Sequence, residues 1–473
     1  MTGRFGLALG VCALAAAAVA WETPVVEIRV VATNAVGKIK PLNGVNNGPN
    51  AENQAGKRGT FRAYRAAQFP YARIHDTAIF WDFAHTGDIS CVFPDFDADV
   101  NDPASYDFEL TDHLLKRVRL AGAEPFYRLG QSIEHWKKKY GVRVPRDYLK
   151  WAQICEHIIR HYNEGWADGY RWNIEHWEIW NEADLYWPGY VCSTWTGDDR
   201  QFFEFYKVVA KHLKSKFPNL KIGGPAAALT RKSSMDWVRR FLKEMREAEV
   251  PIDFFSWHQY ACTLDRIPSL AAEIREALDA SGYKSAESVV TEWNYNRNFG
   301  DQYWYTLEQC SREERAAAFI AATMCAVQNT SVTKMMLYET SPVSNLNSLF
   351  EPRTRSPAKG YWSFIAWKTL RGLGEQVETL PVADPEFRVC AARNPETGRT
   401  AVLIARYRNN DAEMRMKTVM LSVDGLRPGP GPTIKYLDSC WNFQTMPVEF
   451  DKGRVRVFME PNSIALIEMP AQR

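Results

Sequence analysis

The chain has 473 residues, of which 46% are hydrophobic and 24% are charged. This composition excludes a disordered chain, and the length fits one large barrel with a smaller domain. The formal net charge of +2 gives no reason to expect nucleic acid or an anionic membrane as a partner. Aromatic residues make up 13% of the chain, with 17 Trp, which suits sugar binding because aromatic rings stack on the apolar faces of pyranoses.

The first twenty residues have the pattern of a targeting segment. Arg4 is the only charge before an apolar run from Phe5 to Val19, and small residues around Ala20 suit a cleavage site. A membrane anchor is the alternative, but the run is short for a span and lacks a basic flank. We therefore expect residues 1–20 to be a cleaved signal peptide, with no membrane span in the mature protein, which is secreted or periplasmic.

Export permits disulfides. One of the nine Cys lies in the predicted signal peptide. Cys91 and Cys192 fall in predicted loops after strands and form the pair we expect to be bridged. Cys155, Cys310 and Cys325 fall in or beside predicted helices, where buried free thiols are expected. No CxxC pair occurs, which argues against structural zinc.

Strands and helices alternate along most of the chain. Residues 21–37 precede this pattern, and we expect their strand to join a C-terminal sheet. Strands of the region 38–373 are predicted at 38–46, 71–74, 124–129, 176–182, 221–223, 254–260, 288–293 and 334–338. Helices are predicted at 60–67, 108–121, 146–163, 199–217, 234–248, 264–280, 312–328 and 358–371. Eight such units predict an α/β fold with a closed (β/α)8 TIM barrel.

The pattern changes after Gly374. Short strands separated by turn residues are predicted at 389–392, 400–407, 416–423, 455–459 and 463–469. Strands of this length and spacing predict a C-terminal accessory β-sandwich, antiparallel, over residues 374–473.

The fourth barrel strand is apolar and ends in Asn181 and Glu182. Apolar strands of this kind are packed on both faces, and the carboxyl ends of barrel strands carry catalytic groups. Glu182 is therefore our candidate acid/base, with its pKa raised by an apolar setting or a like charge. Asn181 is expected to bond the hydroxyl beside the anomeric carbon. The alternative is an Asn-Glu pair that caps a helix.

The seventh strand has the same design and delivers Glu292 to the same end of the barrel. Two such carboxyl groups indicate glycoside cleavage, with Glu292 as the nucleophile. A nucleophile must stay ionised, and Arg73 and Tyr260 are the expected donors because both end barrel strands. His258 lies two residues before Tyr260 and therefore points the same way. A core salt bridge for Arg73 and a structural role for His258 are the alternatives.

Further side chains at strand ends are weaker candidates for contacts with sugar hydroxyls. They are His75 and Asp76 after strand two, Glu339 after strand eight, and Trp293 beside the candidate nucleophile. Solvated loop positions are the alternative for the polar side chains. The Trp293 ring would either stack on a sugar or pack in the core.

Two other patterns in the sequence resemble functional motifs. His157 and His161 lie four apart on a predicted helix, but no Glu follows His157, and the helix belongs to the outer ring of the barrel. We expect no metal and no cofactor. Asn329-Thr330-Ser331 fits a glycosylation sequon, which matters in a eukaryotic secretory host.

These motifs resemble the retaining (β/α)8 glycoside hydrolases of clan A and, within them, glycoside hydrolase family 39. The resemblance rests on Arg73-Ile74-His75, Trp177-Glu178-Ile179-Trp180-Asn181-Glu182, His258-Gln259-Tyr260, Thr291-Glu292-Trp293-Asn294 and Glu460-Pro461-Asn462-Ser463-Ile464-Ala465-Leu466. It implies an O-glycosyl hydrolase with Glu182 as acid/base and Glu292 as nucleophile. It also implies 2-hydroxyl binding by Asn181 and site contacts by His258 and Tyr260.

The sequence departs from the family pattern around the sugar subsite. Residues 44–49 lack the His expected in xylosidase members, and His75-Asp76 stands where His-Gly is common. We expect an exported exo-acting enzyme for pentose-containing oligosaccharides, β-xylosidase-like or arabinose-releasing. An α-L-iduronidase-like enzyme, an endo-acting polysaccharide hydrolase and an inactive carbohydrate-binding barrel are the alternatives.

Overall fold

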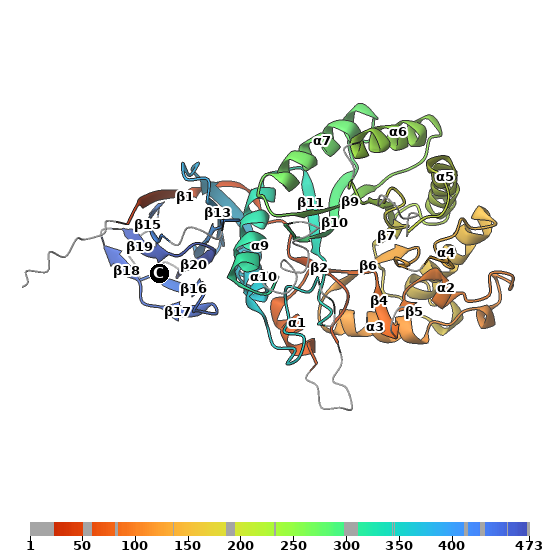
Figure 1. The fold of residues 1–473 in the computed structure, drawn as a ribbon, viewed down its shortest axis with the longest axis horizontal. Helices are drawn as coiled ribbons and strands as arrows, with labels where there is room; N and C mark the ends of the chain where they lie inside the picture. Colours follow the sequence, from red (N-terminus) through yellow and green to blue (C-terminus); the bar gives the residue numbers. More distant parts are fainter. Residues whose placement is uncertain are drawn as a thin grey trace, which may run out of the picture.

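In the computed structural model the chain forms two parts that lie side by side, a closed barrel surrounded by helices and a curled sheet (Figure 1). The structure describes residues 23–50, 59–80, 84–135, 137–185, 194–230, 233–297, 311–342, 344, 346–410, 415–425, 431–451 and 453–470. In this part of the chain no helix has the length and apolar character that a membrane crossing needs. The predicted signal peptide lies outside the described residues.

Eight parallel strands close the barrel in chain order, which confirms the predicted (β/α)8 fold. They are β2 (Gly44–Asn46), β3 (Tyr71–Ile74), β6 (Glu124–Leu129), β7 (His176–Ile179), β8 (Lys221–Ala227), β9 (Phe254–Ala261), β10 (Glu287–Tyr295) and β11 (Val332–Leu337). The first barrel strand is shorter than predicted, because Lys38 ends a strand of the other sheet and residues 39–43 form no strand. β8 runs on through Gly224 and Pro225, beyond the predicted end of that strand.

Helices cover the outside of the barrel (Figure 1). They are α1 (Phe61–Ala67), α3 (Glu109–Leu120), α4 (Tyr148–Asn163), α5 (Asp199–Lys216), α6 (Ser234–Glu247), α7 (Arg266–Ala280), α9 (Glu314–Val327) and α10 (Lys359–Leu373). α5 shows how the sequence builds them, since Asp198 and Gln201 form a capping box at its start. Its buried side chains Phe202, Tyr206 and Val209 recur at helical spacing and pack on the barrel.

Smaller elements decorate the loops. The long segment between β3 and α3 contains the hairpin β4 (Thr77–Phe80) and β5 (Ala84–Thr86), the short helix α2 (Ile89–Val92) and the 3-10 turn η1 (Pro103–Ser105). A second 3-10 turn, η2 (Trp166–Asp168), follows α4. The β3–α3 segment leaves the carboxyl end of its strand and therefore lies at the mouth of the barrel.

The second part is one curled sheet of ten strands in the order β17-β16-β20-β14-β13-β12-β1-β15-β19-β18. The strands are β1 (Val25–Lys38), β12 (Glu375–Thr379), β13 (Phe387–Arg393), β14 (Thr400–Arg406), β15 (Lys417–Asp424), β16 (Thr433–Leu437), β17 (Gln444–Met446), β18 (Glu449–Asp451), β19 (Arg454–Met459) and β20 (Ser463–Met469). β1 lies antiparallel to β12 and parallel to β15. The sheet is therefore mixed where an antiparallel one was expected, because β1 enters it from the far end of the chain.

Two helices, α9 and α10, lie between the barrel and the second sheet (Figure 1). Every residue of α9 from Ala316 to Met324 is buried. A helix that is apolar on all sides must be covered on all sides, and here the barrel and the second sheet cover opposite faces. The two parts thus share a continuous core along this helix pair.

The cysteines differ from expectation at one place. Cys91 carries a free thiol, which argues against the predicted bridge, and Cys192 lies outside the described residues. Cys155 and Cys325 are buried free thiols, as predicted. Cys310 also lies outside the described residues.

Candidate active site

Arg73, near the end of β3, donates hydrogen bonds to four side chains at the mouth of the barrel, one of them Asn46 at 3.2 Å. Its guanidinium donates to Glu178 at 2.6 Å, to Glu292 at 2.7 Å and to the Asn181 side-chain oxygen at 2.7 Å. Burial alone would lower the pKa of Arg73, but the carboxylates of Glu178 and Glu292 raise it above its ordinary value. One permanent cation therefore holds two carboxylates and two amides together.

Glu292 on β10 accepts hydrogen bonds on both of its oxygens. Arg73 donates to Oε1, and the Tyr260 hydroxyl donates to Oε2 at 2.9 Å. Burial raises the pKa of Glu292, while the His258 ring and the Arg73 guanidinium oppose that rise. Two donors to the charged form favour an ionised carboxylate, which is the state a nucleophile needs.

Glu182 follows β7 and has a different environment. Its Oε1 lies 2.7 Å from Nδ1 of His258. Burial raises the pKa of Glu182 to about 8, and the carboxylate of Asp184 adds to the rise. Glu182 is therefore protonated at neutral pH, which is the state a general acid needs.

The His258 ring links this carboxyl group to β10. Burial lowers the pKa of His258 to about 4, so the ring is neutral. Its Nε2 lies 3.1 Å from the Thr291 hydroxyl, and an N–H there donates to that oxygen. Nδ1 is then the acceptor and receives the proton of Glu182 in a hydrogen bond.

The carboxylate oxygens of Glu182 and Glu292 and a ring nitrogen of His258 all lie within 4.8 Å of one another. This spacing would also suit a metal ion. However, Arg73 already pairs with Glu292, and a protonated Glu182 is a poor metal ligand. The set is therefore better suited to proton transfer beside an ionised carboxylate.

An irregularity in β10 turns Glu292 into the barrel. Glu287 and Val289 face the interior, so strict alternation would place Thr291 and Trp293 there too. The pairing of β10 with β9 shifts between Val290 and Glu292. A bulge of this kind re-aims the side chains beyond it, and Glu292 faces inward as a result.

A second irregularity serves the other strand. Trp180 has a φ of 68° and Glu182 a φ of 49°, both in the left-handed region. The Trp180 ring packs outward, with its centre 5.4 Å from the ring centre of Trp151 and 5.1 Å from that of Trp195. Strained backbone of this kind persists where the surroundings fix it and gathers at functional sites.

Other predicted contacts converge on the same place. The Asn181 Nδ2 atom and both ring nitrogens of His75 are buried and make no hydrogen bond to the described residues, so they are available to a ligand. Glu339 accepts a hydrogen bond from the Asn47 side chain, and burial raises the pKa of Glu339 to about 8. Asp76 lies 3.4 Å from His75 Nε2.

Trp293 does not belong to the site. It is fully buried, and its ring centre lies 6.4 Å from that of Phe319 on α9. The bulge that turns Glu292 inward turns its neighbour outward to the helices. The prediction that Trp293 stacks on a sugar is therefore wrong, and the ring is part of the core.

Sequence reasoning missed three positioning residues. Asn46 accepts from Arg73 at 3.2 Å and donates to the Thr291 carbonyl at 2.8 Å, and the Thr291 hydroxyl holds His258. Asp184 accepts from two backbone N–H groups after β8, at 2.8 and 3.1 Å. The strand-end rule that selected Arg73 could have found Asn46. Asp184 gave no such signal, because its partners are backbone groups distant in sequence.

The His pair on α4 has structural partners. His161 bonds the Trp166 carbonyl and Asp112, at 2.9 and 3.1 Å. His157 bonds the Gln153 carbonyl at 2.9 Å. The helical spacing that resembled a metal site thus serves packing between α4 and its neighbours.

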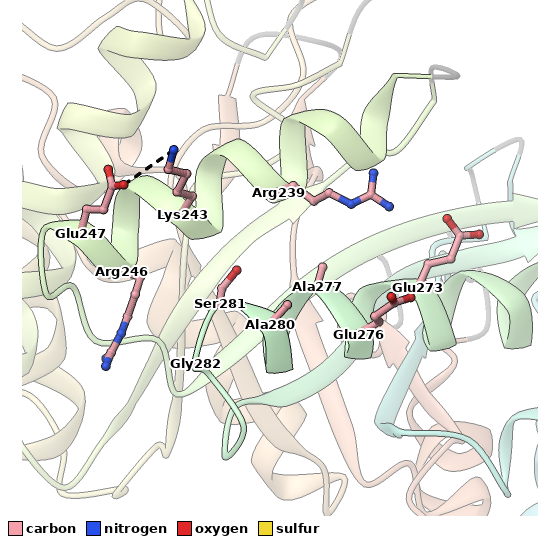
Figure 2. Close-up of a pocket in the computed structure, with 10 residues that line it drawn as sticks. All are labelled: Arg239, Lys243, Arg246, Glu247, Glu273, Glu276, Ala277, Ala280, Ser281 and Gly282. Carbon is pink, nitrogen blue, oxygen red and sulfur yellow. Dashed lines mark ion pairs between the residues drawn. The ribbon is translucent and has the colours of Figure 1, made fainter.

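A cavity of about 590 Å³ lies away from these groups, between α6 and α7 on the outer ring (Figure 2). Charged side chains line it, including Arg239 and Glu273, and Lys243 pairs with Glu247 at 3.8 Å. It contains none of the strand-end residues. The groups with altered pKa values at the barrel mouth are therefore the candidate catalytic centre.

The chain matches the model of the glycosyl hydrolases family 39 over residues 51–335. It belongs to this family. This match confirms the family that the motifs of the sequence resemble.

Individual proteins are also similar to this chain in sequence or in structure. A β-xylosidase from Geobacillus stearothermophilus is 30% identical over 171 residues, which cover 33% of this chain and only 31% of that relative. A glucosidase structure from Croceicoccus marinus has a TM-score of 0.75 at 23% identity, over 95% of this chain and 100% of that one. A monomeric β-xylosidase structure from Caulobacter crescentus has a TM-score of 0.67 at 17% identity, with the same coverage. At such identities the two structures establish the common fold.

Proposed function

We propose that this family 39 enzyme hydrolyses glycosides with retention of configuration, through a covalent glycosyl-enzyme. The spacing of the two carboxyl groups carries the proposal. Oxygens of Glu182 and Glu292 lie within 4.8 Å. Retaining enzymes separate these groups by about 5–5.5 Å, and inverting enzymes by about 6.5–9.5 Å.

In the first step, the ionised Glu292 attacks the anomeric carbon, and the bond from that carbon to the glycosidic oxygen breaks. Glu182 gives its proton to this oxygen, so that the aglycone leaves as an alcohol. Tyr260 and Arg73 hold Glu292 in place. Asn181 Nδ2 donates to the neighbouring sugar hydroxyl, a contact that strengthens as positive charge develops on the ring.

In the second step, Glu182 acts as the base. It takes a proton from the water that attacks the anomeric carbon, and Glu292 departs as a carboxylate. The pKa of His258 is lowered to about 4 by burial, so the ring does not compete for this proton. Both residues then return to their starting protonation states.

We propose a neutral pentose as the sugar and exo action as the mode. The name of the Geobacillus relative, β-xylosidase, supports a xylosidase-type activity. Arg73 is bonded to two carboxylates and two amides and is not free to bind the carboxylate of an iduronide. Arabinose-releasing activity remains within the proposal.

Hydrolysis of an aryl glycoside panel tests this function. The panel contains β-D-xyloside, both L-arabinosides, β-D-glucoside and α-L-iduronide. We expect release from a pentoside that vanishes in Glu292→Ala, with the retained anomer formed first by proton NMR. Release of the inverted anomer would contradict the mechanism, and release from the iduronide alone would contradict the sugar. Release from polymeric xylan but from no aryl glycoside would contradict exo action.

We also propose that residues 1–20 are removed on export. The charge at Arg4 and the apolar run to Val19 support this. The test is expression of the full chain in a bacterium, with N-terminal sequencing of the exported protein. We expect it to begin at Trp21, and an intact N-terminus in the cytoplasmic fraction would contradict export.

A further inference from the structure

The curled sheet carries a groove of about 360 Å³ between its two ends. β16 and β17 form one side, β18 and β19 form the other, and these strands stand at opposite ends of the ten-stranded order. The buried side chains of Ile434, Tyr436 and Val457 line the groove. The groove exists because the sheet curls until its ends approach each other.

Two large aromatic side chains flank this groove and face solvent. Trp441 is 40% exposed and Phe458 is 41% exposed. The guanidinium of Arg456 lies 5.0 Å from the ring centre of Phe458. Exposed aromatic rings grouped at a concave surface mark a binding site more often than single exposed apolar residues do.

Carboxylates also line the groove. Asp438 and Glu460 line the groove together with Glu449. Asp438 Oδ1 accepts from the backbone N–H of Trp441 at 2.8 Å, which fixes the turn that bears this ring. Glu460 accepts from the Ser439 hydroxyl at 2.9 Å. These bonds occupy one oxygen of Asp438 and one of Glu460, and Oε2 of Glu449 lies 3.6 Å from a guanidinium nitrogen of Arg456. The groove therefore combines apolar ring faces with hydrogen-bond acceptors.

The turn that bears Trp441 lies at the mouth end of the barrel. Lys359, the first residue of α10, donates to the carbonyls of Asp438 at 2.6 Å and Ser439 at 3.2 Å. α10 starts at the mouth and returns to the opposite end, where the Gly374 carbonyl accepts from Ile39 ahead of β2 at 2.9 Å. The groove thus stands on the side of the molecule to which the catalytic centre opens.

We propose that this groove binds a segment of a neutral polysaccharide chain, at a site separate from the catalytic centre. A sugar ring presents apolar C–H faces, which stack on aromatic rings, and a rim of hydroxyls, which donate to carboxylates. Three carboxylates against one guanidinium disfavour an acidic chain. A second copy of the protein could cover the rings, but its surface would have to satisfy the same carboxylates.

Depletion binding to insoluble polysaccharides tests the groove. The protein carries Glu292→Gln to prevent hydrolysis, and the probes are insoluble xylan, cellulose and mannan. The choice of xylan as a probe rests on the proposed function. The proposal of a binding site in the groove does not depend on that function. We expect retention on at least one probe, and Trp441→Ala should weaken it about tenfold, as expected when an aromatic anchor is truncated.

Two variants serve as controls. Trp441→Phe keeps a ring and should keep most of the binding. Phe450→Ala removes a side chain that is 50% exposed on neighbouring β18 but does not line the groove, and it should leave binding unchanged. When they are made in the active enzyme, with Glu292 intact, Trp441→Ala, Trp441→Phe and Phe450→Ala should all leave aryl glycoside hydrolysis unchanged.

Three results would contradict the proposal that the groove binds a polysaccharide. The first is retention on none of the polysaccharides. The second is equal binding by wild type and Trp441→Ala. The third is a loss of dimer mass in Trp441→Ala on sedimentation, which would make the groove a contact between copies. The aryl glycoside panel reports on the catalytic centre alone, so failure of the groove and failure of the proposed function are separable.

Discussion

Strand β10 carries two carboxylates that show how the two ends of the barrel differ. At its start, Glu287 pairs with Lys221 and Lys334, and His176 Nε2 lies 3.8 Å away. Burial would raise the pKa of Glu287, but His176 and the two lysines hold it well below its ordinary value. Near the other end of the strand, Glu292 shares one guanidinium with Glu178, and its pKa is raised.

Inside the barrel, a lower charged layer around Glu287 and an upper charged layer around Glu292 are separated by an apolar layer. The apolar layer consists of Phe126, Phe254, Val289 and Met336. Both carboxylates are largely buried, so burial alone does not explain their opposite shifts. The number of nearby cations explains the opposite shifts. Two lysines neutralise Glu287 in the lower layer, whereas one guanidinium serves two carboxylates in the upper layer. The neutralised layer at the start of the strands thus stabilises the fold, and the layer at their carboxyl ends carries the catalytic groups, as expected for the two faces of a barrel.

The largest expected effect separates these two positions. Glu292→Gln should lower kcat by about four orders of magnitude or more, because it removes the nucleophile, while Glu287→Gln should leave kcat per folded molecule unchanged. Stopped assays on the best aryl glycoside, with circular dichroism to confirm folding, make the comparison. Azide should restore turnover in Glu292→Gly and give a glycosyl azide of inverted configuration. Equal losses in the two Gln variants would remove the distinction between the barrel ends.

The next effect concerns the proton of Glu182. Glu182→Gln should lower kcat for an alkyl glycoside by about 10²- to 10⁴-fold, because the leaving alcohol needs a proton. The first step with a dinitrophenyl glycoside should change far less, since that leaving group departs as an anion. Pre-steady-state bursts on the two substrates measure the difference. A uniform loss on both would show that Glu182 does not act as the acid.

A third effect belongs to the lower layer. Glu287→Gln should reduce the free energy of unfolding by about 3 kcal/mol, because it leaves Lys334 and Lys221 unpaired. The folded pKa of Glu287 lies below its unfolded value of about 4.3, so its stabilisation is present above that pH and is lost as the pH falls. Urea unfolding at pH 7 and about pH 3 should therefore show a larger acid loss in wild type than in the variant. Similar losses would contradict the role given to these ion pairs.

The sequence was sufficient to predict the barrel and most of the site. Apolar strands alternate with amphipathic helices, and polar residues stand at the strand ends, where Arg73, Glu182, His258 and Tyr260 are found together. The exact facing of side chains on β10 was not predictable. Period-two alternation places Trp293 inside, and only the pairing with β9 reveals the bulge.

The second sheet was harder to predict for a related reason. β16, β17 and β18 are short and separated by turn residues, and their pairing partners are distant in sequence. The parallel pair of β1 with β15 joins residues nearly four hundred positions apart. No local pattern encodes such a contact, nor the groove that forms where the sheet ends approach each other.

The smallest effect sharpens the comparison at the mouth of the barrel. Activity requires a protonated Glu182 and is lost as the pH rises through its pKa of about 8. After burial, the negative charge of Asp184 is the largest cause of this raised pKa. Asp184→Asn should therefore lower it and move the alkaline limb of kcat/KM to lower pH, by about half a unit to one unit.

The matched control is Asp279→Asn, which breaks a surface ion pair with Arg275 and should move neither limb. The pH profile of kcat/KM on one aryl glycoside measures both variants. An unmoved alkaline limb in Asp184→Asn would mean that burial alone sets the proton affinity of Glu182. Charge balance would then govern the lower layer but not the acid at the mouth.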